Sequence, residues 1–168
     1  MIEIIGAKGK IDNVDEFLKR VKDFSLDKNV KIQIFNADTI YGKNHLLSAY
    51  EHSIRAFKTK TNATNSLEIE IILYAAGERQ IKIAIPKVGI KNGNSNIAII
   101  LIKNKNFQDK LIDELMIRFK LIRDESVLLG NINKLIRFGI KKEELDTISE
   151  LEYEDLILEK VALVDILK

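Results

Sequence analysis

The sequence contains no cysteine, which excludes both a disulfide framework and a thiolate metal site. No stretch approaches the roughly 18 uncharged apolar residues that a membrane-spanning helix needs. The GxGxxG fingerprint of dinucleotide-binding proteins and the GxSxG setting of a catalytic serine are also missing. The apolar run at residues 2–5 is short and includes Glu3, which is not typical of a signal peptide. We therefore expect a cytoplasmic protein.

The composition is that of a folded globular protein. Of the 168 residues, 46% are hydrophobic and 31% are charged. A chain of this length buries about two thirds of its unfolded surface when it forms one core. We predict a single domain over residues 1–168, because no linker, internal repeat or low-complexity tract interrupts the chain.

Charge is distributed unevenly along the chain, although the net charge is only +2. Residues 43–91 hold eight basic and four acidic side chains, and residues 92–140 hold eight and five. Residues 141–168 hold four basic and nine acidic side chains. The middle of the chain could attract a phosphate backbone and its end would repel one, although ordinary surface scatter gives the same counts.

Hydrophobic periodicity and capping residues predict an α/β fold. We expect a small sheet of three or four strands covered by several helices, with a helical C-terminal third. Asn65 or Ser66 is a cap, and Gly77 a stop, for one of these helices. Strands are predicted at residues 2–5, 30–35 and 96–102, and helices at residues 13–23, 44–57, 66–76, 80–88, 107–120, 126–138, 141–149 and 151–167.

The glycine-containing run at residues 6–10 faintly resembles a phosphate-binding loop. Only two residues separate its glycines, whereas a Walker loop has four, and Ile11 stands where Ser or Thr would follow the lysine. We interpret the run as a plain turn between a strand and a helix.

The two histidines are seven residues apart on one predicted helix. Helical zinc pairs are four residues apart, so His45 and His52 are poorly spaced to bind one metal ion. His45 lies near the helix start, where free N–H groups attract an anion, although an exposed histidine in a capping turn is an equally good interpretation.

Basic and amide side chains collect around the predicted helix ends between residues 43 and 82. Cations of this kind hold phosphates, and amides can contact base edges. A solvated helix face is the alternative interpretation. The basic members are Lys43, Arg55, Lys58, Lys60, Arg79 and Lys82.

The predicted C-terminal helix carries apolar residues on more than one face. A helix that lies on one core needs a single apolar stripe, so the second face is either deeply buried or available to a partner. Neighbouring acidic residues would favour a basic partner.

Short segments spread over much of the chain share an order and spacing with a known family. They are Asn44-His45, Arg55-Ala56-Phe57, Ser66-Leu67, Ala75-Ala76-Gly77, Arg79-Gln80-Ile81, Gly89-Ile90 and Leu158-Glu159-Lys160-Val161-Ala162-Leu163. In these segments the chain resembles the smallest, tRNA-binding subunit of the KEOPS complex. This family includes the PRPK-binding protein of eukaryotes and its archaeal counterparts, and the archaeal type is the more similar.

The resemblance implies an adaptor without catalytic activity, cofactor or metal. In that family the subunit binds a kinase-like ATPase and captures the 3′ CCA end of tRNA, in a complex that makes threonylcarbamoyladenosine at position 37. For tRNA contacts we predict Lys43, Asn44, His45, Arg55, Lys58, Lys60, Arg79, Gln80 and Lys82. For the ATPase subunit we predict Ile148, Leu151, Leu158 and Ala162.

Two alternatives remain open at this point. One is a protein-only regulator of the kinase-like ATPase with no RNA contact. The other is a small hydrolase or transferase that uses His45 or His52, although no partner base, nucleophile or metal ligand accompanies either histidine.

Overall fold

The computed structural model describes residues 1–104 and 109–167, and the chain divides into two compact units. The first unit comprises Met1–Ala37 and Ile90–Leu128. The second comprises Asp38–Gly89 and Leu129–Lys168. A short 3-10 turn, Ala37–Thr39, lies where the chain passes from one to the other. In the described parts of the chain, no helix is both long enough and apolar enough to cross a membrane.

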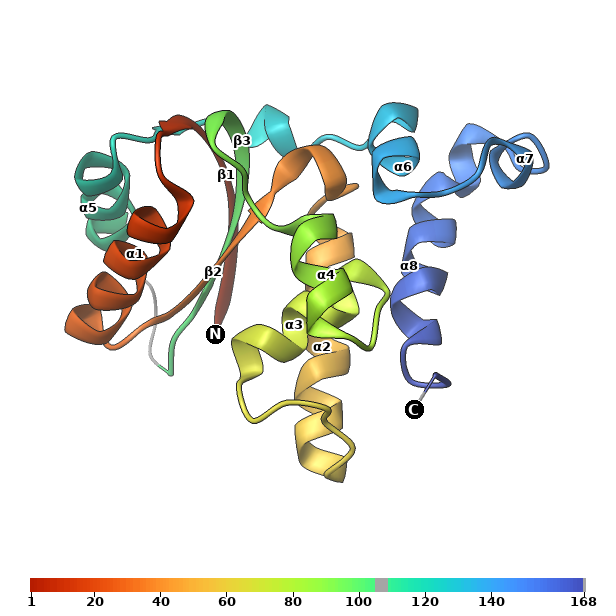
Figure 1. Ribbon diagram of the computed structural model, residues 1–168, viewed down its shortest axis with the longest axis horizontal. Helices are drawn as coiled ribbons and strands as arrows, with labels where there is room; N and C mark the ends of the chain where they lie inside the picture. Colours follow the sequence, from red (N-terminus) through yellow and green to blue (C-terminus); the bar gives the residue numbers. More distant parts are fainter. Residues whose placement is uncertain (105–108, 168) are drawn as a thin grey trace. The chain divides into compact units, whose positions relative to one another are not determined.

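The first unit is a four-stranded antiparallel sheet whose strand order is β2-β3-β1-β4. Two helices, α1 and α5, lie side by side in Figure 1 and pack on one face of this sheet. The core between them consists of alternate strand residues together with aromatic residues such as Phe17, Phe24 and Phe119. The elements are β1 (Ile2–Ile11), α1 (Val14–Lys28), β2 (Lys31–Asn36), β3 (Gly93–Ile102), α5 (Asp109–Phe119), β4 (Ile122–Arg123) and a 3-10 turn (Glu125–Leu128).

Strand β1 corrects the prediction of a turn at residues 6–10, because the strand continues through them to Ile11. A Cβ atom on Gly6 would lie 2.4 Å from the carbonyl oxygen of Asp124, and one on Gly9 would lie 2.4 Å from Leu121 Cδ2. The glycines are therefore required by the close approach of another segment, not by a turn. That segment includes β4, a strand the sequence did not predict.

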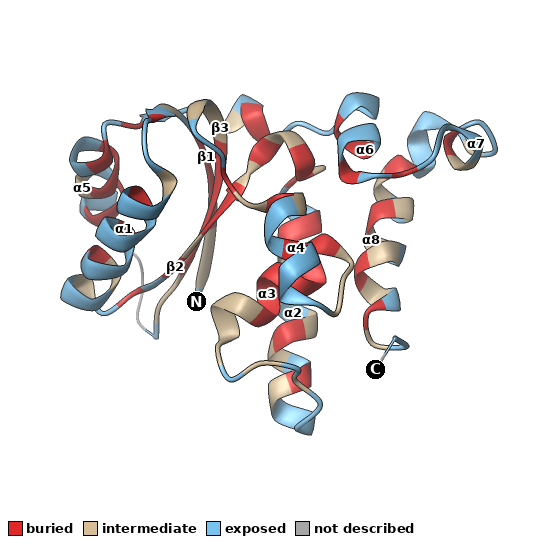
Figure 2. Cartoon of the chain, in the orientation of Figure 1, coloured by how far each residue is buried: buried red, intermediate tan, exposed pale blue. Residues whose placement is uncertain are grey.

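The second unit is helical and is built around α3, in which every residue from Glu70 to Ala76 is buried. Figure 2 shows α3 as an almost continuous buried segment. Helices α2, α4 and α8 pack against it. The elements are α2 (Lys43–Thr59), α3 (Leu67–Ala76), α4 (Ile81–Val88), α6 (Ile132–Phe138), α7 (Lys142–Leu145), a 3-10 turn (Glu150–Glu152) and α8 (Tyr153–Leu163).

The predicted α/β class, the sheet size and the helical C-terminal third are confirmed. The C-terminal helices are shorter than predicted. The helix expected at residues 126–138 is interrupted, and Gly130 lies so close to Tyr41 that a Cβ atom would be 2.5 Å from ring atom Cε1. The helix expected at residues 141–149 is reduced to Lys142–Leu145, and the last one to Tyr153–Leu163. The predicted start of α5 at Phe107 lies outside the described residues.

Candidate functional site

His45 is a structural residue of the core, and its predicted contact with tRNA stays a prediction. Its side chain is completely buried, and its ring packs edge-on against Phe138 with 5.6 Å between centroids. Nδ1 accepts the N–H of Tyr41 at 3.1 Å, so the proton is on Nε2, which donates to the carbonyl of Ala75 at 2.8 Å. Burial lowers the pKa of His45 to about 4, and the ring is therefore neutral. It presents no surface to a nucleotide.

The second histidine is used to hold three segments together. His52 on α2 is hydrogen-bonded to the carboxylate of Asp165, which also accepts the hydroxyl of Tyr74 on α3. Among residues 1–104 and 109–167, no group of three or more His, Asp or Glu side chains is placed to hold a metal ion. Both histidines therefore have partners that serve the fold, and neither lies in a catalytic constellation.

The elbow between α2 and α3, residues 60–66, is an ordered loop held by a buried carboxylate. Glu70 is 1% exposed, and its carboxylate accepts the backbone N–H groups of Ala63 and Thr64 and the Thr64 hydroxyl at 2.9–3.1 Å. Lys60 begins the loop in a left-handed conformation, with φ of 57°. From the sequence, Glu70 was interpreted only as a carboxylate in the first turn of a helix. Its partners Ala63 and Thr64 lie in the preceding loop, and helical spacing does not predict contacts with a loop.

The predicted tRNA-binding residues fall into two groups at opposite ends of α2. Arg55, Lys58 and Lys60 are exposed near the elbow. Lys43 is exposed on the first turn, which lies about 20 Å away along a helix of this length. His45, in the first turn of α2, contacts Ala75 near the end of α3. The α3–α4 connection, which carries Arg79, Gln80 and Lys82, therefore lies nearer to the first turn of α2 than to the elbow.

The α3–α4 connection combines cationic, amide and apolar groups. Gly77 ends α3 with φ of 66°, and Gln80 is the N-cap of α4 without a side-chain capping bond. Gln80 and Lys82 are exposed. Within the described residues, Arg79 Nη1 is buried and has no hydrogen-bond acceptor, which is costly for a guanidinium group unless a ligand supplies one.

Exposed isoleucines on α4 were not singled out from the sequence. Ile81, Ile83 and Ile85 are each 42–47% exposed, whereas only Ala84 and Val88 of this helix are buried. The sequence did contain a signal for them. The segment is an apolar helix of only eight residues that contains Pro86, and so short a helix cannot bury all of its faces.

Asn44 is exposed, but its side chain connects two helices. Its side-chain amide donates to Glu154 on α8 at 3.0 Å. The predicted contact between Asn44 and tRNA stays a prediction, and it would have to compete with this hydrogen bond.

Helix α8 has one buried row and one outward row of apolar residues. Tyr153, Ile157 and Val161 face the core. Leu158 and Ala162 are each one residue after a buried one, Ile157 and Val161, and so point about 100° away from the buried row. Both are only partly buried. Figure 2 shows this difference in burial along α8. Leu151, in the preceding turn, is 92% exposed.

Acidic side chains border this outward row. Asp155 and Glu159 are exposed on α8, and Glu143 and Asp146 are exposed near α7. Ile148, the remaining residue predicted to bind the ATPase subunit, is partly buried. The arrangement is that of an apolar strip within a negatively charged surface.

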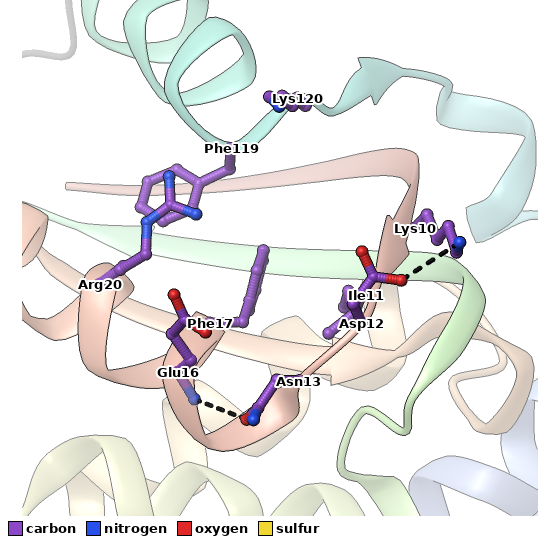
Figure 3. Close-up of a pocket in the computed structure, with 9 residues that line it drawn as sticks. All are labelled: Lys10, Ile11, Asp12, Asn13, Glu16, Phe17, Arg20, Phe119 and Lys120. Carbon is purple, nitrogen blue, oxygen red and sulfur yellow. Dashed lines mark hydrogen bonds and ion pairs between the residues drawn. The ribbon is translucent and has the colours of Figure 1, made fainter.

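A cavity of about 210 Å³ lies in the first unit, and none of the predicted site residues lines it. It lies between the end of β1, the first half of α1 and the end of α5 (Figure 3). Arg20 covers the ring of Phe119, 5.3 Å from its centroid, and donates to the carbonyl of Arg118. The polar side chains that line the cavity are exposed and of both signs, so they favour no one class of ligand.

Two comparisons relate the chain to known proteins. Residues 9–165 match the family described as "Kinase binding protein CGI-121". The chain is 33% identical over 151 residues to "Regulatory protein Cgi121" of Methanocaldococcus jannaschii, which covers 89% of this chain and 93% of that protein. Neither description is of a catalytic activity.

Proposed function

The chain belongs to the CGI-121 family of kinase-binding proteins, and on that basis we propose that it is a non-catalytic adaptor of the KEOPS tRNA-modification complex. It binds the kinase-like ATPase subunit and recruits tRNA through the 3′ CCA end. The complex then makes threonylcarbamoyladenosine at position 37, and the chemistry belongs to other subunits.

The observation that carries the first half of this proposal is the outward row of α8. Leu158 and Ala162 on α8, and Leu151 in the turn before it, are apolar and not buried, whereas Tyr153, Ile157 and Val161 of the same helix are. A surface strip of this kind, with charged residues at its rim, is typical of a docking site for a protein. The acidic rim favours a basic surface on the ATPase subunit.

The α3–α4 connection supports the second half. Arg79 and Lys82 supply positive charge for phosphates, and Gln80 can hydrogen-bond a base edge. The exposed Ile81 provides an apolar surface against which an unpaired base can lie. Unpaired 3′ nucleotides expose both phosphate and base faces, so this mixture fits a single-stranded end better than a duplex.

The partner-binding proposal is tested with Leu158→Glu. We expect this substitution to weaken binding of the ATPase subunit by 100-fold or more, on the order of 3 kcal/mol, because it places a charge in an apolar contact. Leu26→Glu is the matched control, because Leu26 is 71% exposed on α1, outside the proposed surface. Binding is measured by titration calorimetry.

Leu158→Glu must also be compared with the unchanged protein by thermal unfolding. A variant that melts normally and fails to bind supports docking through α8. A variant that melts normally and binds as tightly as the unchanged protein removes Leu158 from the interface and contradicts the proposal.

A further inference from the structure

One carboxylate ties the turn after α8 to two other helices. Asp165 Oδ2 lies 2.7 Å from His52 Nδ1 on α2, and the hydroxyl of Tyr74 on α3 donates to Asp165 Oδ1 at 2.5 Å. The rings of His52 and Tyr74 are 5.5 Å apart, and Tyr74 is completely buried. We call Asp165, His52 and Tyr74 the Asp165 clasp. Burial, and then Asp165 itself, raises the pKa of Tyr74, so its hydroxyl remains a donor at all physiological pH values.

A second polar contact joins α2 to the other end of α8. Asn44 donates to Glu154 in the first turn of α8, and His52 lies about two turns after Asn44 on α2. Helix α2 therefore holds α8 at both ends, with the buried residues Ile157 and Val161 between the two contacts. The two helices must run in the same direction for both contacts to form.

The far end of α8 needs this support. The helix has 11 residues, and isolated helices of that length are marginal in water. Its outward residues Leu158 and Ala162 lie in the last two turns, next to the exposed Leu163 and Ile166. Among residues 160–164 only Val161 and Val164 are buried, so the end of the helix is held by few apolar contacts and frays readily unless something fixes it.

We propose that the Asp165 clasp positions the partner-binding surface of α8, an inference that rests on the proposed function. By fixing the chain just beyond the last turn, the clasp presents Leu158 and Ala162 on a preformed helix. The partner then binds without ordering that turn itself, which lowers the entropic cost of association. Asp165, His52 and Tyr74 are positioning residues in this account, and none of them needs to touch the partner.

The proposal is tested with Asp165→Ala and Tyr74→Phe. We expect Asp165→Ala to weaken binding of the ATPase subunit about tenfold, the scale set by the loss of a charge-assisted hydrogen bond. Tyr74→Phe changes only a buried hydroxyl and should weaken binding about threefold without altering the binding surface. Asp23→Ala, at an exposed site on α1 outside both the clasp and the acidic rim, is the control for the lost charge.

Two further readouts separate positioning from a general loss of stability or charge. Amide hydrogen exchange in residues 158–163 should become faster in both clasp variants, while residues 71–75 of α3 stay protected. The loss of affinity in Asp165→Ala should persist in about 0.5 M salt, where interactions between exposed charges are screened.

The possible outcomes distinguish this inference from the proposed function. Faster exchange at the end of α8 together with weaker binding supports the positioning role. Unchanged binding despite faster exchange, or unchanged exchange in both variants, overturns it. If the unchanged protein does not bind the ATPase subunit at all, the proposed function fails first and the positioning role fails with it, whereas the exchange data still report whether the clasp holds the helix.

Discussion

At the residue scale, the burial of His45 has a measurable consequence for pH dependence. The folded-state pKa of about 4 lies below the usual value of 6.5, so the folded protein disfavours the charged ring. The stabilisation is complete above pH 6.5 and is lost as the pH falls toward 4, by about 3 kcal/mol in total. We expect an NMR titration to show the His45 ring neutral down to pH 5, with a parallel fall in the free energy of unfolding. A midpoint near 6.5 for this ring would contradict the buried geometry.

Glu70 gives a second prediction at this scale. Glu70→Gln places an amide where the carboxylate accepts the N–H groups of Ala63 and Thr64, so donors would then face donors. We expect a loss of about 2 kcal/mol in the free energy of unfolding, measured by urea denaturation. Glu68→Gln is the matched control, because Glu68 is only partly buried two residues away, and its loss should stay below about 1 kcal/mol. Equal effects of the two substitutions would mean that the elbow does not depend on Glu70.

Single residues were the hardest feature to predict from the sequence. Residue type alone suggested an anion contact for His45, but the ring completes the core between α2, α3 and α6. A signal was present, because Ala49, Ser53 and Ala56 share its helix face and are all small and buried. The role of Asp165 could not be foreseen, since its partners are about 90 and 110 residues earlier in the chain.

At the element scale, local chemistry predicted the helices that begin and end with their own signals. Ser66, one of two predicted caps, caps α3, and Gly77 ends it, while α4 begins one residue after the predicted start at Gln80. Prediction was wrong at Gly6 and Gly9, where glycine is required by a segment more than 100 residues away. Helix capping depends on residues that are close in sequence, so it can be predicted from the sequence alone. The close approach of two backbone segments depends on residues that are close in space, and these are known only once the fold is known.

The separation of basic residues along α2 gives a prediction at the element scale. If the CCA end binds at the α3–α4 connection, Lys82→Glu should weaken tRNA binding about tenfold and reduce its salt dependence. Lys58→Glu, the same substitution at the elbow end of α2, should have a clearly smaller effect on an oligonucleotide that ends in CCA. Fluorescence anisotropy with such an oligonucleotide measures both. A larger effect of Lys58→Glu would place the 3′ end at the elbow instead.

At the scale of the whole molecule, the family assigns the chain to the regulatory, kinase-binding proteins. The prediction that the chain is not an enzyme is confirmed by its family, and the predicted resemblance is confirmed by the match over residues 9–165. The uneven charge in the sequence corresponds to different surfaces, with cations around α2 and α4 and carboxylates around α7 and α8. Sequence could not divide the chain into its two compact units, because each is assembled from two separate stretches, and the prediction of one domain stays a prediction.

The central claim is that the adaptor recruits tRNA by its 3′ end, and one binding experiment tests it most directly. The purified chain is titrated with intact tRNA and with the same tRNA lacking its CCA end, at low and moderate salt. We predict tight binding of intact tRNA that weakens steeply with salt and is lost when the CCA is removed. Equal binding of both tRNAs, or binding of neither, would contradict the recruitment claim and leave a regulator that acts on its protein partner alone.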